Sequence, residues 1–471
     1  MPARIGRGME ESRTGARILL REAIGVNRTA VDTFMACGYR DASMKILVIG
    51  GGGREHALVW KLRQSPLAEK IWCAPGNGGI SQDAECMPTN AGDVPGLLAL
   101  AERLRPDLTV VGPELPLVNG IVDAFSARGM KIVGPSKAAA QLEGSKVFAK
   151  EFLTRHGIPT AATYGIHDSA GAAYSALCAV DWPMVIKADG LAAGKGVLVA
   201  STPDDATAFI ERLMEKREFG AAGEKVLLEE ALEGEELSYI VLTDGQHVLP
   251  MAPTQDHKRA LDGDLGPNTG GMGAYSIDGL LPAELEDTIH RTIVQPTIAG
   301  LAKDGLPYCG FLYFGLMVTP QGPKVLEFNC RMGDPEAQAV VLRMDFDLAA
   351  ALMAVAETKL SLVKAKWNPA ASACVVVASG GYPGEFAAGM KIEGLPLSGN
   401  EAVVFHAGTK READVYYTCS GRVLGVAAAA ANLSAALRRA YRAASSIRFD
   451  GAHYRTDIGA KALNKAQRSG A

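Results

Sequence analysis

Short apolar runs alternate with helical segments between residues 45 and 144, and this alternation constrains the fold more than any other feature of the chain. Each run ends beside Gly or Pro: the runs are 46–49, 71–74, 108–111 and 131–133, and a helix is expected over 55–64. Strands that are apolar throughout indicate a parallel α/β sheet covered on both faces. Ligands of such sheets bind where the carboxyl ends of strands meet the next turn. The turns at 50–56, 74–79 and 111–116 are therefore the first candidates for a binding site.

The pattern changes after residue 145, where strands follow one another with only turns between them. Helices are expected at 146–156, 204–214 and 282–302, and strands at 184–187, 197–200, 226–230, 237–242, 310–318 and 324–329. This order indicates an α+β region with antiparallel hairpins. A third region begins with a strand at 374–378 and contains an amphipathic helix at 432–445. We expect domains over 44–144, 145–347 (with a lid hairpin at about 184–240) and 373–471, joined by a connector over 348–372.

Residues 1–43 are expected to be an upstream extension, poorly ordered and with little structural role. They carry seven Arg and five acidic residues but no apolar core, so they fit neither a signal peptide nor an acid-poor transit peptide. Met44 is a start-like residue directly before a buried strand.

The composition excludes several classes of protein. Of 471 residues, 48% are hydrophobic and 21% charged, which allows a large core and excludes disorder. The formal net charge of −4 offers no basic surface to a nucleic acid, and no apolar run reaches the roughly 18 residues of a membrane span. The eight cysteines are scattered without a C-x-x-C pair, which favours buried thiols in a reducing cytoplasm and argues against zinc. The 53 glycines indicate many tight turns and close approaches of backbone to ligand.

The Gly-rich turn at 50–56 precedes a helix, as dinucleotide-binding turns do. The G-x-G-x-x-G pattern fails, however, because Glu55 and His56 stand where its last glycine would be. The second strand also ends without an acidic residue for a ribose diol. Backbone N–H groups at a helix start, with Arg54, suit an anion. The turn therefore indicates either an anion site or a tight turn without a ligand.

Residues 187–197 form a Gly-rich hairpin between two strands. It is not a P-loop, because Gly196 follows Lys195 where Ser or Thr is needed. Backbone N–H groups of such a tip can fold over phosphates. A flexible hairpin is the alternative, but Lys187 in an otherwise apolar strand needs a partner, so we favour phosphate binding.

An apolar strand at 226–230 runs into a group of acidic residues. Glu229, Glu230 and Glu236 are suited to an adenine amino group and a ribose. Taken alone, the segment is better explained as a solvated acidic turn.

The loop at 255–275 is long and Gly-rich, so it is either functional or a mobile surface loop. Asp256, His257 and Lys258 would carry its chemistry.

The segment 325–336 is the most specific site in the chain. Because alternate residues of a strand share a face, Glu327 and Asn329 point one way while Leu326 and Phe328 pack the other way. The segment continues with three charged residues, Arg331, Asp334 and Glu336. Two oxygen ligands followed by such charges are typical of a Mg²⁺–phosphate site. Exposed polar alternation is the alternative, but it does not explain polar residues that interrupt an apolar strand.

Taken together, these segments resemble the ATP-grasp ligases, and the match to one member, a ligase of purine biosynthesis, is close. The resemblance runs in unbroken order from about Met44 to Gln467. The matching segments are Gly-Gly-Arg-Glu-His-Ala (52–57), Ala-Pro-Gly-Asn (74–77), Val-Gly-Pro-Glu (111–114), Gln-Leu-Glu-Gly-Ser-Lys (141–146), 186–197, Gln-Asp-His-Lys-Arg (255–259), 266–275, 327–336 and Phe-His-Ala-Gly-Thr (405–409). The resemblance implies an N-terminal parallel α/β domain, an ATP-grasp domain and a small C-terminal mixed α/β domain.

The resemblance also implies a reaction, in which ATP, glycine and 5-phosphoribosylamine give glycinamide ribonucleotide, ADP and phosphate. Glycine would be activated as glycyl phosphate, which the ribosylamine nitrogen then attacks. The implied cofactors are ATP and Mg²⁺ or Mn²⁺. A cytoplasmic monomer or weak oligomer is expected, in transient contact with neighbouring enzymes of purine biosynthesis and without nucleic-acid or membrane partners.

Individual roles follow from the same resemblance. ATP would be bound by Lys146, Lys187, Gly190, Gly194, Lys195, Gly196, Glu229, Glu230, Ala231, Leu232 and Glu236. The metal would be bound by Glu327 and Asn329, and the catalytic residues would be Arg331, Lys187 and Asp256. The small substrates would be bound by Gly53, Arg54, Glu55, Asn77, Gly78, Glu114, Asp256, Lys258, Gly271, Gly273, Asp334 and Glu336.

Many ATP-grasp enzymes take another metal carboxylate from the strand before this segment, and residues 311–318 offer none. Two other hypotheses remain: an ATP-grasp ligase acting on a different carboxylate, and a catalytically silent nucleotide-binding or regulatory protein. The presence of Lys187, Glu327, Asn329 and Arg331 argues against the silent protein.

Overall fold

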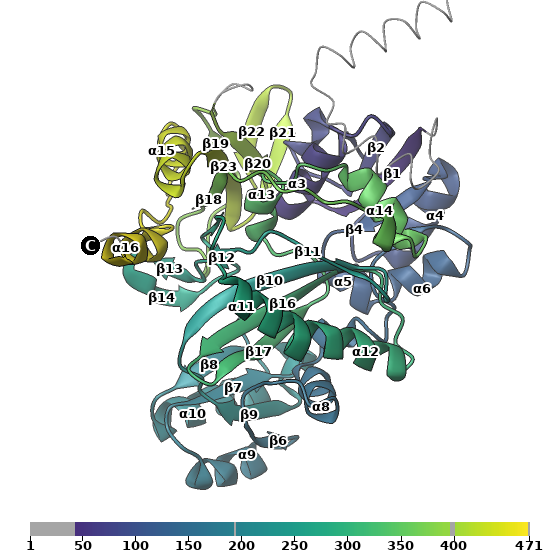
Figure 1. Cartoon of the computed structure of the whole chain (residues 1–471). Helices are drawn as coiled ribbons and strands as arrows, with labels where there is room; N and C mark the ends of the chain where they lie inside the picture. Colours follow the sequence, from purple (N-terminus) through teal and green to yellow (C-terminus); the bar gives the residue numbers. More distant parts are fainter. Residues whose placement is uncertain (1–42, 193–194, 396–400, 470–471) are drawn as a thin grey trace, which may run out of the picture.

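The computed structural model describes residues 43–192, 195–395 and 401–469, and the structural statements below concern these residues. The expectation for the N-terminal extension therefore lies outside the described residues, except at Ser43. Figure 1 shows the N-terminal domain and the C-terminal sheet side by side, above the central strands and helices. Within the described ranges, no helix is long and apolar enough to cross a bilayer.

The N-terminal domain is the predicted parallel sheet, with strands in the order β3-β2-β1-β4-β5. Its elements are β1 (Met44–Gly50), α3 (Gly53–Leu62), β2 (Ala68–Pro75), β3 (Glu85–Cys86), α4 (Val94–Leu104), β4 (Leu108–Val111), α5 (Glu114–Val118), α6 (Ile121–Ser126) and β5 (Ile132–Val133). The central strand β1 pairs in parallel with β2 and β4. Their carboxyl ends therefore meet, and the N–H groups of Gly76 and Gly112 donate to the carbonyls of Gly50 (3.0 Å) and Ile49 (2.9 Å).

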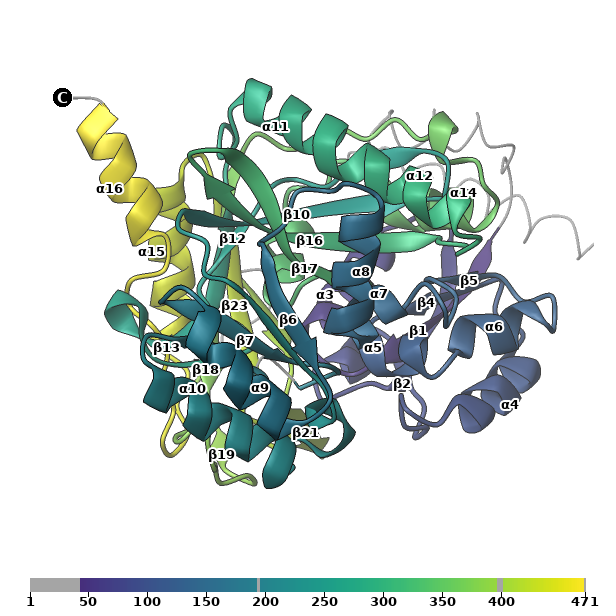
Figure 2. The ribbon, with the colours of Figure 1, turned by 90° about the horizontal axis from the view of Figure 1, so that it is seen from below.

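The central region contains two antiparallel four-stranded sheets, β6-β9-β7-β8 and β11-β10-β16-β17. Its elements are α7 (Gln141–Gly144), α8 (Lys146–Arg155), β6 (Thr163–His167), α9 (Ala170–Ala176), β7 (Met184–Ala188), β8 (Val197–Ala200), α10 (Pro203–Ile210), β9 (Val226–Glu230), β10 (Glu235–Thr243), β11 (Val248–Pro250), α11 (Ala283–Ile289), α12 (Gln295–Lys303), β16 (Gly310–Thr319), β17 (Gly322–Asn329), α13 (Glu336–Val340) and α14 (Leu348–Ala356). Figure 2 shows α11 and α12 lying along the second sheet, and α9 and α10 covering the first.

The helix expected over 282–302 is present but interrupted. A π-helical turn, η6 (His290–Val294), separates α11 from α12. Pro296 at the start of α12 has no backbone N–H and cannot continue the i to i−4 ladder, which accounts for the interruption.

The C-terminal sheet has the order β12-β15-β18-β23-β20, beside a smaller sheet β19-β22-β21 and a hairpin of β13 and β14. Its elements are β12 (Gln255–Asp256), β13 (Arg259–Leu261), β14 (Leu265–Asn268), β15 (Gly273–Ser276), β18 (Ala371–Ala378), β19 (Lys391–Ile392), β20 (Val403–His406), β21 (Thr409–Glu412), β22 (Val415–Thr418), β23 (Arg422–Ala430), α15 (Leu433–Ala444) and α16 (Ala460–Ser469). The 255–275 segment is thus not an irregular loop. Its strand β15 pairs antiparallel with β18, so this segment is part of the C-terminal sheet.

Candidate active site

The candidate site lies where the start of α3 meets the turn that follows β17. The backbone N–H of Arg54 donates to Asp334 Oδ2 at 3.2 Å, and its Nη1 donates to the Met332 carbonyl at 3.2 Å. Arg54 Nε also pairs with Glu55 Oε1 at 2.6 Å, and both side chains are buried. Two motifs about 280 residues apart in the sequence are therefore in direct contact.

Arg331 stands at the centre of this junction. Its Nη2 lies 2.8 Å from Glu143 Oε1, and its Nε lies 3.4 Å from Glu114 Oε2 at the start of α5. Burial lowers the pKa of Arg331, but Glu143 and Glu114 outweigh burial and the net shift is upward. Nε makes no hydrogen bond among the described residues, although it is buried. A permanently charged guanidinium whose Nε has only this long ion pair to Glu114 is suited to a transferred phosphoryl group.

Glu143 was missed by sequence reasoning, although it lies within a matching segment. It is buried, and its second oxygen accepts a hydrogen bond from the Cys330 N–H at 2.6 Å. Burial raises the pKa of Glu143 despite the opposing effect of Arg331. Glu143 therefore fixes both the backbone and the guanidinium at the end of β17.

Lys187 has the partner that its apolar strand requires. Its ammonium contacts one oxygen of Glu229 and donates to the Leu326 carbonyl at 2.9 Å. The other oxygen of Glu229 lies 2.7 Å from the ammonium of Lys150, a residue of α8 that sequence reasoning also missed. The carboxylate of Glu229 is therefore buried between two lysines, and its side chain does not reach an open surface.

The face of β17 that carries Glu327 and Asn329 is set by a β-bulge. Glu327 stands opposite Gly315 and Val325 opposite Leu316, so the bulge leaves Leu326 without a partner on β16. Val325 and Phe328 are fully buried, whereas Leu326 is only partly buried. The expected packing of Leu326 with Phe328 is thus wrong, because strict alternation stops at a bulge.

Glu327 and Asn329 each meet a cation. Lys146 Nζ lies 2.8 Å from Glu327 Oε2, and Arg331 Nη2 donates to Asn329 Oδ1 at 3.2 Å. Burial raises the pKa of Glu327, but Lys146 and Lys258 outweigh burial and keep the carboxyl group ionised. A carboxylate and an amide oxygen on one face are hard ligands of the kind Mg²⁺ prefers, with water and phosphate completing the shell. The donor set therefore fits such an ion.

Asp256 and Lys258 approach the same face from the C-terminal sheet. Lys258 Nζ lies 2.8 Å from Glu236 Oε2 at the start of β10. Burial raises the pKa of Asp256 to about 7, with Lys258 opposing the shift and Glu336, Glu236 and Glu327 adding to it. Asp256 is thus poised to exchange a proton near neutral pH.

His257, between these two residues, lies elsewhere. Its ring is buried, and its Nε2 accepts a hydrogen bond from the Gly459 N–H at 3.3 Å. Burial, with the nearby charge of Arg455, lowers the pKa of His257 to about 4. The ring is therefore held neutral against the C-terminal segment.

Several predicted site residues contribute packing. A Cβ atom on Gly53 would lie 2.5 Å from Gln338 Nε2, one on Gly271 2.5 Å from Pro335 Cδ, and one on Gly273 2.6 Å from Ile458 Cδ1. Gly78 is similarly close to the backbone of β21. These glycines let side chains or backbone from distant parts of the sequence pack directly against them.

The Gly-rich hairpin at 187–197 is described only in part, because residues 193 and 194 lie outside the described residues. Gly190 has φ +149° and packs against Ala222, while Lys195 is exposed. Asp189 Oδ1 accepts hydrogen bonds from Ser145 Oγ (2.6 Å) and the Val147 N–H (3.1 Å), which ties the hairpin to the start of α8. Beyond the hairpin, Glu230 accepts from the Ala162 N–H at 3.0 Å, and Ala231 and Leu232 are partly exposed.

Asn77 has all four hydrogen-bonding positions of its amide engaged within the protein. Nδ2 donates to the carbonyls of Gly51 (2.9 Å) and His406 (2.7 Å), and Oδ1 accepts from the N–H groups of Gly79 and Ile80 (2.9 Å each). The side chain joins the N-terminal domain to the C-terminal sheet.

Replacing Asn77 by alanine should therefore destabilise the protein by roughly 2–3 kcal/mol, since buried partners lose their hydrogen bonds. Denaturant unfolding would measure the change. Asn90→Ala is the control, because the Asn90 side chain accepts one local hydrogen bond, from the Gly92 N–H at 2.8 Å. Equal midpoints for the two variants would contradict the role of Asn77.

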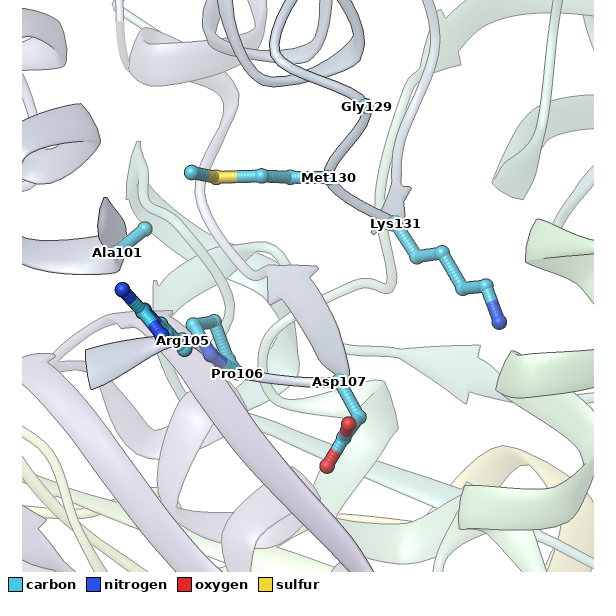
Figure 3. Close-up of a pocket in the computed structure, with 7 residues that line it drawn as sticks. All are labelled: Ala101, Arg105, Pro106, Asp107, Gly129, Met130 and Lys131. Atoms are coloured by element: carbon cyan, nitrogen blue, oxygen red, sulfur yellow. The ribbon is translucent and has the colours of Figure 1, made fainter. Parts of the chain in front are cut away.

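A separate surface hollow of about 290 Å³ lies on the N-terminal domain, away from this site. Figure 3 shows its lining, which includes Arg105, Pro106, Asp107, Met130 and Lys131. These residues precede β4 and β5, so the hollow lies at the amino ends of the two strands. Ligands of parallel sheets bind at the opposite, carboxyl ends.

Comparison with known families covers most of the chain. Models of the phosphoribosylglycinamide synthetase N domain, ATP-grasp (A) domain and C domain match residues 44–143, 144–337 and 372–461. The phosphoribosylamine–glycine ligase of Salmonella typhimurium is 50% identical over 429 residues, which cover 90% of this chain and 100% of the relative. The corresponding ligase of Allochromatium vinosum is 50% identical over 424 residues, with coverage of 89% and 99%.

Solved structures agree with this match. A crystal structure of phosphoribosylamine–glycine ligase from Thermotoga maritima superposes with a TM-score of 0.75 at 30% identity, covering 88% of this chain and 100% of that one. A biotin carboxylase from Campylobacter jejuni, at 16% identity, superposes with a TM-score of 0.68 over 87% of this chain and 93% of that one. At that identity the likeness shows the fold alone.

Proposed function

Because this chain belongs to the phosphoribosylglycinamide synthetase family, we propose that it joins glycine to 5-phosphoribosylamine, converting ATP to ADP and phosphate and giving glycinamide ribonucleotide. The observation that carries the proposal is the position of Arg331. It stands between Glu114 of the N-terminal domain and the Glu327–Asn329 face of the ATP-grasp domain. The group suited to a transferred phosphoryl is thus placed at the junction of the two domains.

The chemistry requires activation because a carboxylate has only oxide as a leaving group. Transfer of the γ-phosphoryl group to a glycine carboxylate oxygen gives glycyl phosphate and releases ADP. The ribosylamine nitrogen then attacks the carbonyl carbon, phosphate leaves and the nitrogen loses a proton. The protein aligns the reactants, neutralises charge and excludes water.

Each part of the site has a task in this scheme. Lys146 and Lys187, with the 190–196 hairpin, bind the ATP phosphates, and Glu229 with Lys150 positions the Lys187 ammonium. The segment from Glu230 to Leu232, with Glu236, borders the adenosine. Glu327 and Asn329 hold Mg²⁺ or Mn²⁺, which when bound neutralises phosphate charge.

The remaining residues serve the small substrates. Gly53, Arg54 and Glu55 at the start of α3, with Asp334 and Glu336, frame the ribosylamine. Lys258 adds positive charge to the same face, and Asp256 accepts the proton from the attacking amine.

We place the enzyme in the cytoplasm, in line with its scattered thiols, and expect a monomer or weak oligomer.

Measuring ADP release with each substrate omitted in turn tests the function. The full rate should require ATP, glycine and phosphoribosylamine together. An ATP-grasp ligase for another carboxylate would instead show no dependence on glycine, and ADP release that ignores phosphoribosylamine would reject the proposal.

The role of Asp256 predicts a specific pH dependence. Its pKa is raised to about 7, so the carboxylate base is lost as the pH falls below that value and is present above it. We expect kcat/KM for phosphoribosylamine to rise with pH and level off above about 7. Asp256→Asn should lower the plateau by about 100-fold and remove this limb. An unchanged limb in the variant would assign the titration to the amine itself.

A further inference from the structure

Arg422, the first residue of β23, brings a guanidinium from the C-terminal sheet to the candidate active site. Its Nη1 donates to the carbonyls of Gly270 (2.7 Å), Gly271 (3.4 Å) and Asp334 (2.5 Å), and lies 3.6 Å from Asp334 Oδ1. Sequence reasoning assigned no role to any residue of this sheet beyond position 372. The contacts nevertheless place Arg422 beside predicted substrate residues from two other parts of the chain.

The rest of this guanidinium is unused. Within the described ranges, Nε and Nη2 of Arg422 make no hydrogen bond or ion pair, and neither is sealed from solvent. The side chain is 24% exposed. Three carbonyls thus fix one nitrogen and leave two donors of a planar fork available.

Two other arginines of the same region are used differently. Arg343 donates through Nε to the Asn368 carbonyl (3.2 Å) and through Nη1 to Ser276 Oγ (2.7 Å), and its Nη2 contacts Asp278. Arg455 likewise engages Nε, Nη1 and Nη2, with Asp457 and Asp264 among its partners. Both side chains are 1% exposed. These two buried arginines have every side-chain nitrogen engaged by protein, and Arg422 does not.

The carboxylate beside Arg422 is also engaged by donors from other segments. Asp334 also accepts hydrogen bonds from the Arg54 N–H and from Gln338 Nε2, so its charge is shared among several donors. A Cβ atom on Gly52 or Gly53 would lie within 3.6 Å of an Asp334 oxygen, which puts the amino end of α3 beside this carboxylate. Burial lowers the pKa of Arg422, but Asp334 and Glu336 outweigh burial and the net shift is upward, with Arg331 near enough to oppose them.

We propose that the Nε and Nη2 donors of Arg422 bind an oxyanion of the acceptor substrates, either the carboxylate of glycine or the 5-phosphate of phosphoribosylamine. The proposal rests on the proposed function. A planar fork with two free donors matches both groups, since carboxylate and phosphate each accept two parallel hydrogen bonds. Arg422 then completes the substrate site from the third domain.

The test measures KM for ATP, glycine and phosphoribosylamine, together with thermal unfolding, for Arg422→Gln and Arg422→Lys. Arg422→Gln should raise KM for either glycine or phosphoribosylamine by roughly 10- to 100-fold, with KM for ATP within about twofold of the wild type. Arg422→Lys keeps the charge without the fork and should show a smaller rise for the same substrate. A rise for glycine identifies the carboxylate, and a rise for phosphoribosylamine identifies the phosphate.

Arg343→Lys is the matched control, because it removes the fork of a buried arginine that is fully engaged by protein. It should lower the unfolding temperature without a selective change in KM. The proposal is overturned if the Arg422 variants change no KM, or change all three together, as a loss of structure alone would. The proposed function fails separately, if the wild-type enzyme shows no ADP release that depends on glycine and phosphoribosylamine.

Discussion

Glu327→Ala should lower turnover by about a thousandfold or more while the protein stays folded. Glu327 carries the negative oxygen of the proposed metal face, and Lys146 and Lys258 hold it ionised despite burial. Alanine removes that ligand, so charge on the transferring phosphoryl group is no longer neutralised. Steady-state ADP release with all three substrates measures the loss, and far-ultraviolet circular dichroism reports the fold.

A second substitution of Glu327 separates the effect of its negative charge from the effect of its side-chain volume. Glu327→Gln keeps the shape of the side chain and one oxygen, so it should lose nearly as much activity if the negative charge is what matters. Glu235→Ala is the control, because Glu235 lies near the start of β10 in the same sheet and is 70% exposed beside Lys465. That variant should retain normal turnover. Near-normal turnover of Glu327→Ala would refute the metal assignment.

The strands of the parallel sheet and most strands of the ATP-grasp domain could be predicted, because each of them is recognisable from its own residues. β4, β8 and β9 have the predicted bounds; β4 and β8 are short apolar runs, and β9 is an apolar run that ends in two acidic residues. The paired strands β16 and β17 were expected for the same reason. In these segments the residues that define the strand are also those that form its core.

The 255–275 segment could not be predicted in this way. Its strands are two to four residues long, and β15 takes its register from β18, about 100 residues later in the chain, while β13 and β14 pair with each other. A strand of that length has no hydrophobic period of its own. Pairing with another strand, and not its own residue pattern, makes each of these short segments a strand, so a loop was expected.

Some residues of the candidate site could likewise be predicted from the sequence, and others could not. Lys187, Glu327 and Arg331 stood out because a charge in an apolar strand, or directly after one, needs an explanation. Lys150 and Glu143 lie on helices, where a charged residue is ordinary, and only the fold shows that each is buried against a site residue. Asn77 was expected to contact substrate, yet its amide joins two domains, because a motif does not reveal which atom faces the ligand.

Arg331 is expected to show the second large effect. Arg331→Met should reduce turnover by about a thousandfold, because the guanidinium proposed to neutralise the transferred phosphoryl group is removed. The same change should also destabilise the fold by about 3–5 kcal/mol, since it leaves Glu143 buried without its cation. Activity loss alone would therefore not distinguish catalysis from unfolding.

A double variant separates the two effects. Glu143→Gln added to Arg331→Met removes the uncompensated charge and keeps a side chain of the same shape. Arg331 lowers the pKa of Glu143 against the opposing effect of burial, so without Arg331 this carboxyl is the group that strains the fold. The double variant should regain most of the lost unfolding temperature and none of the lost turnover.

If the double variant recovered turnover together with stability, Arg331 would serve only to neutralise the buried charge of Glu143. Recovery of stability alone would assign the guanidinium to the reacting phosphoryl group. Arg331→Lys sharpens the distinction, because it retains the charge that Glu143 needs but cannot present several donors in one plane. We therefore expect it to be nearly as stable as the wild type and at least about 100-fold slower, a combination that a merely structural arginine does not produce.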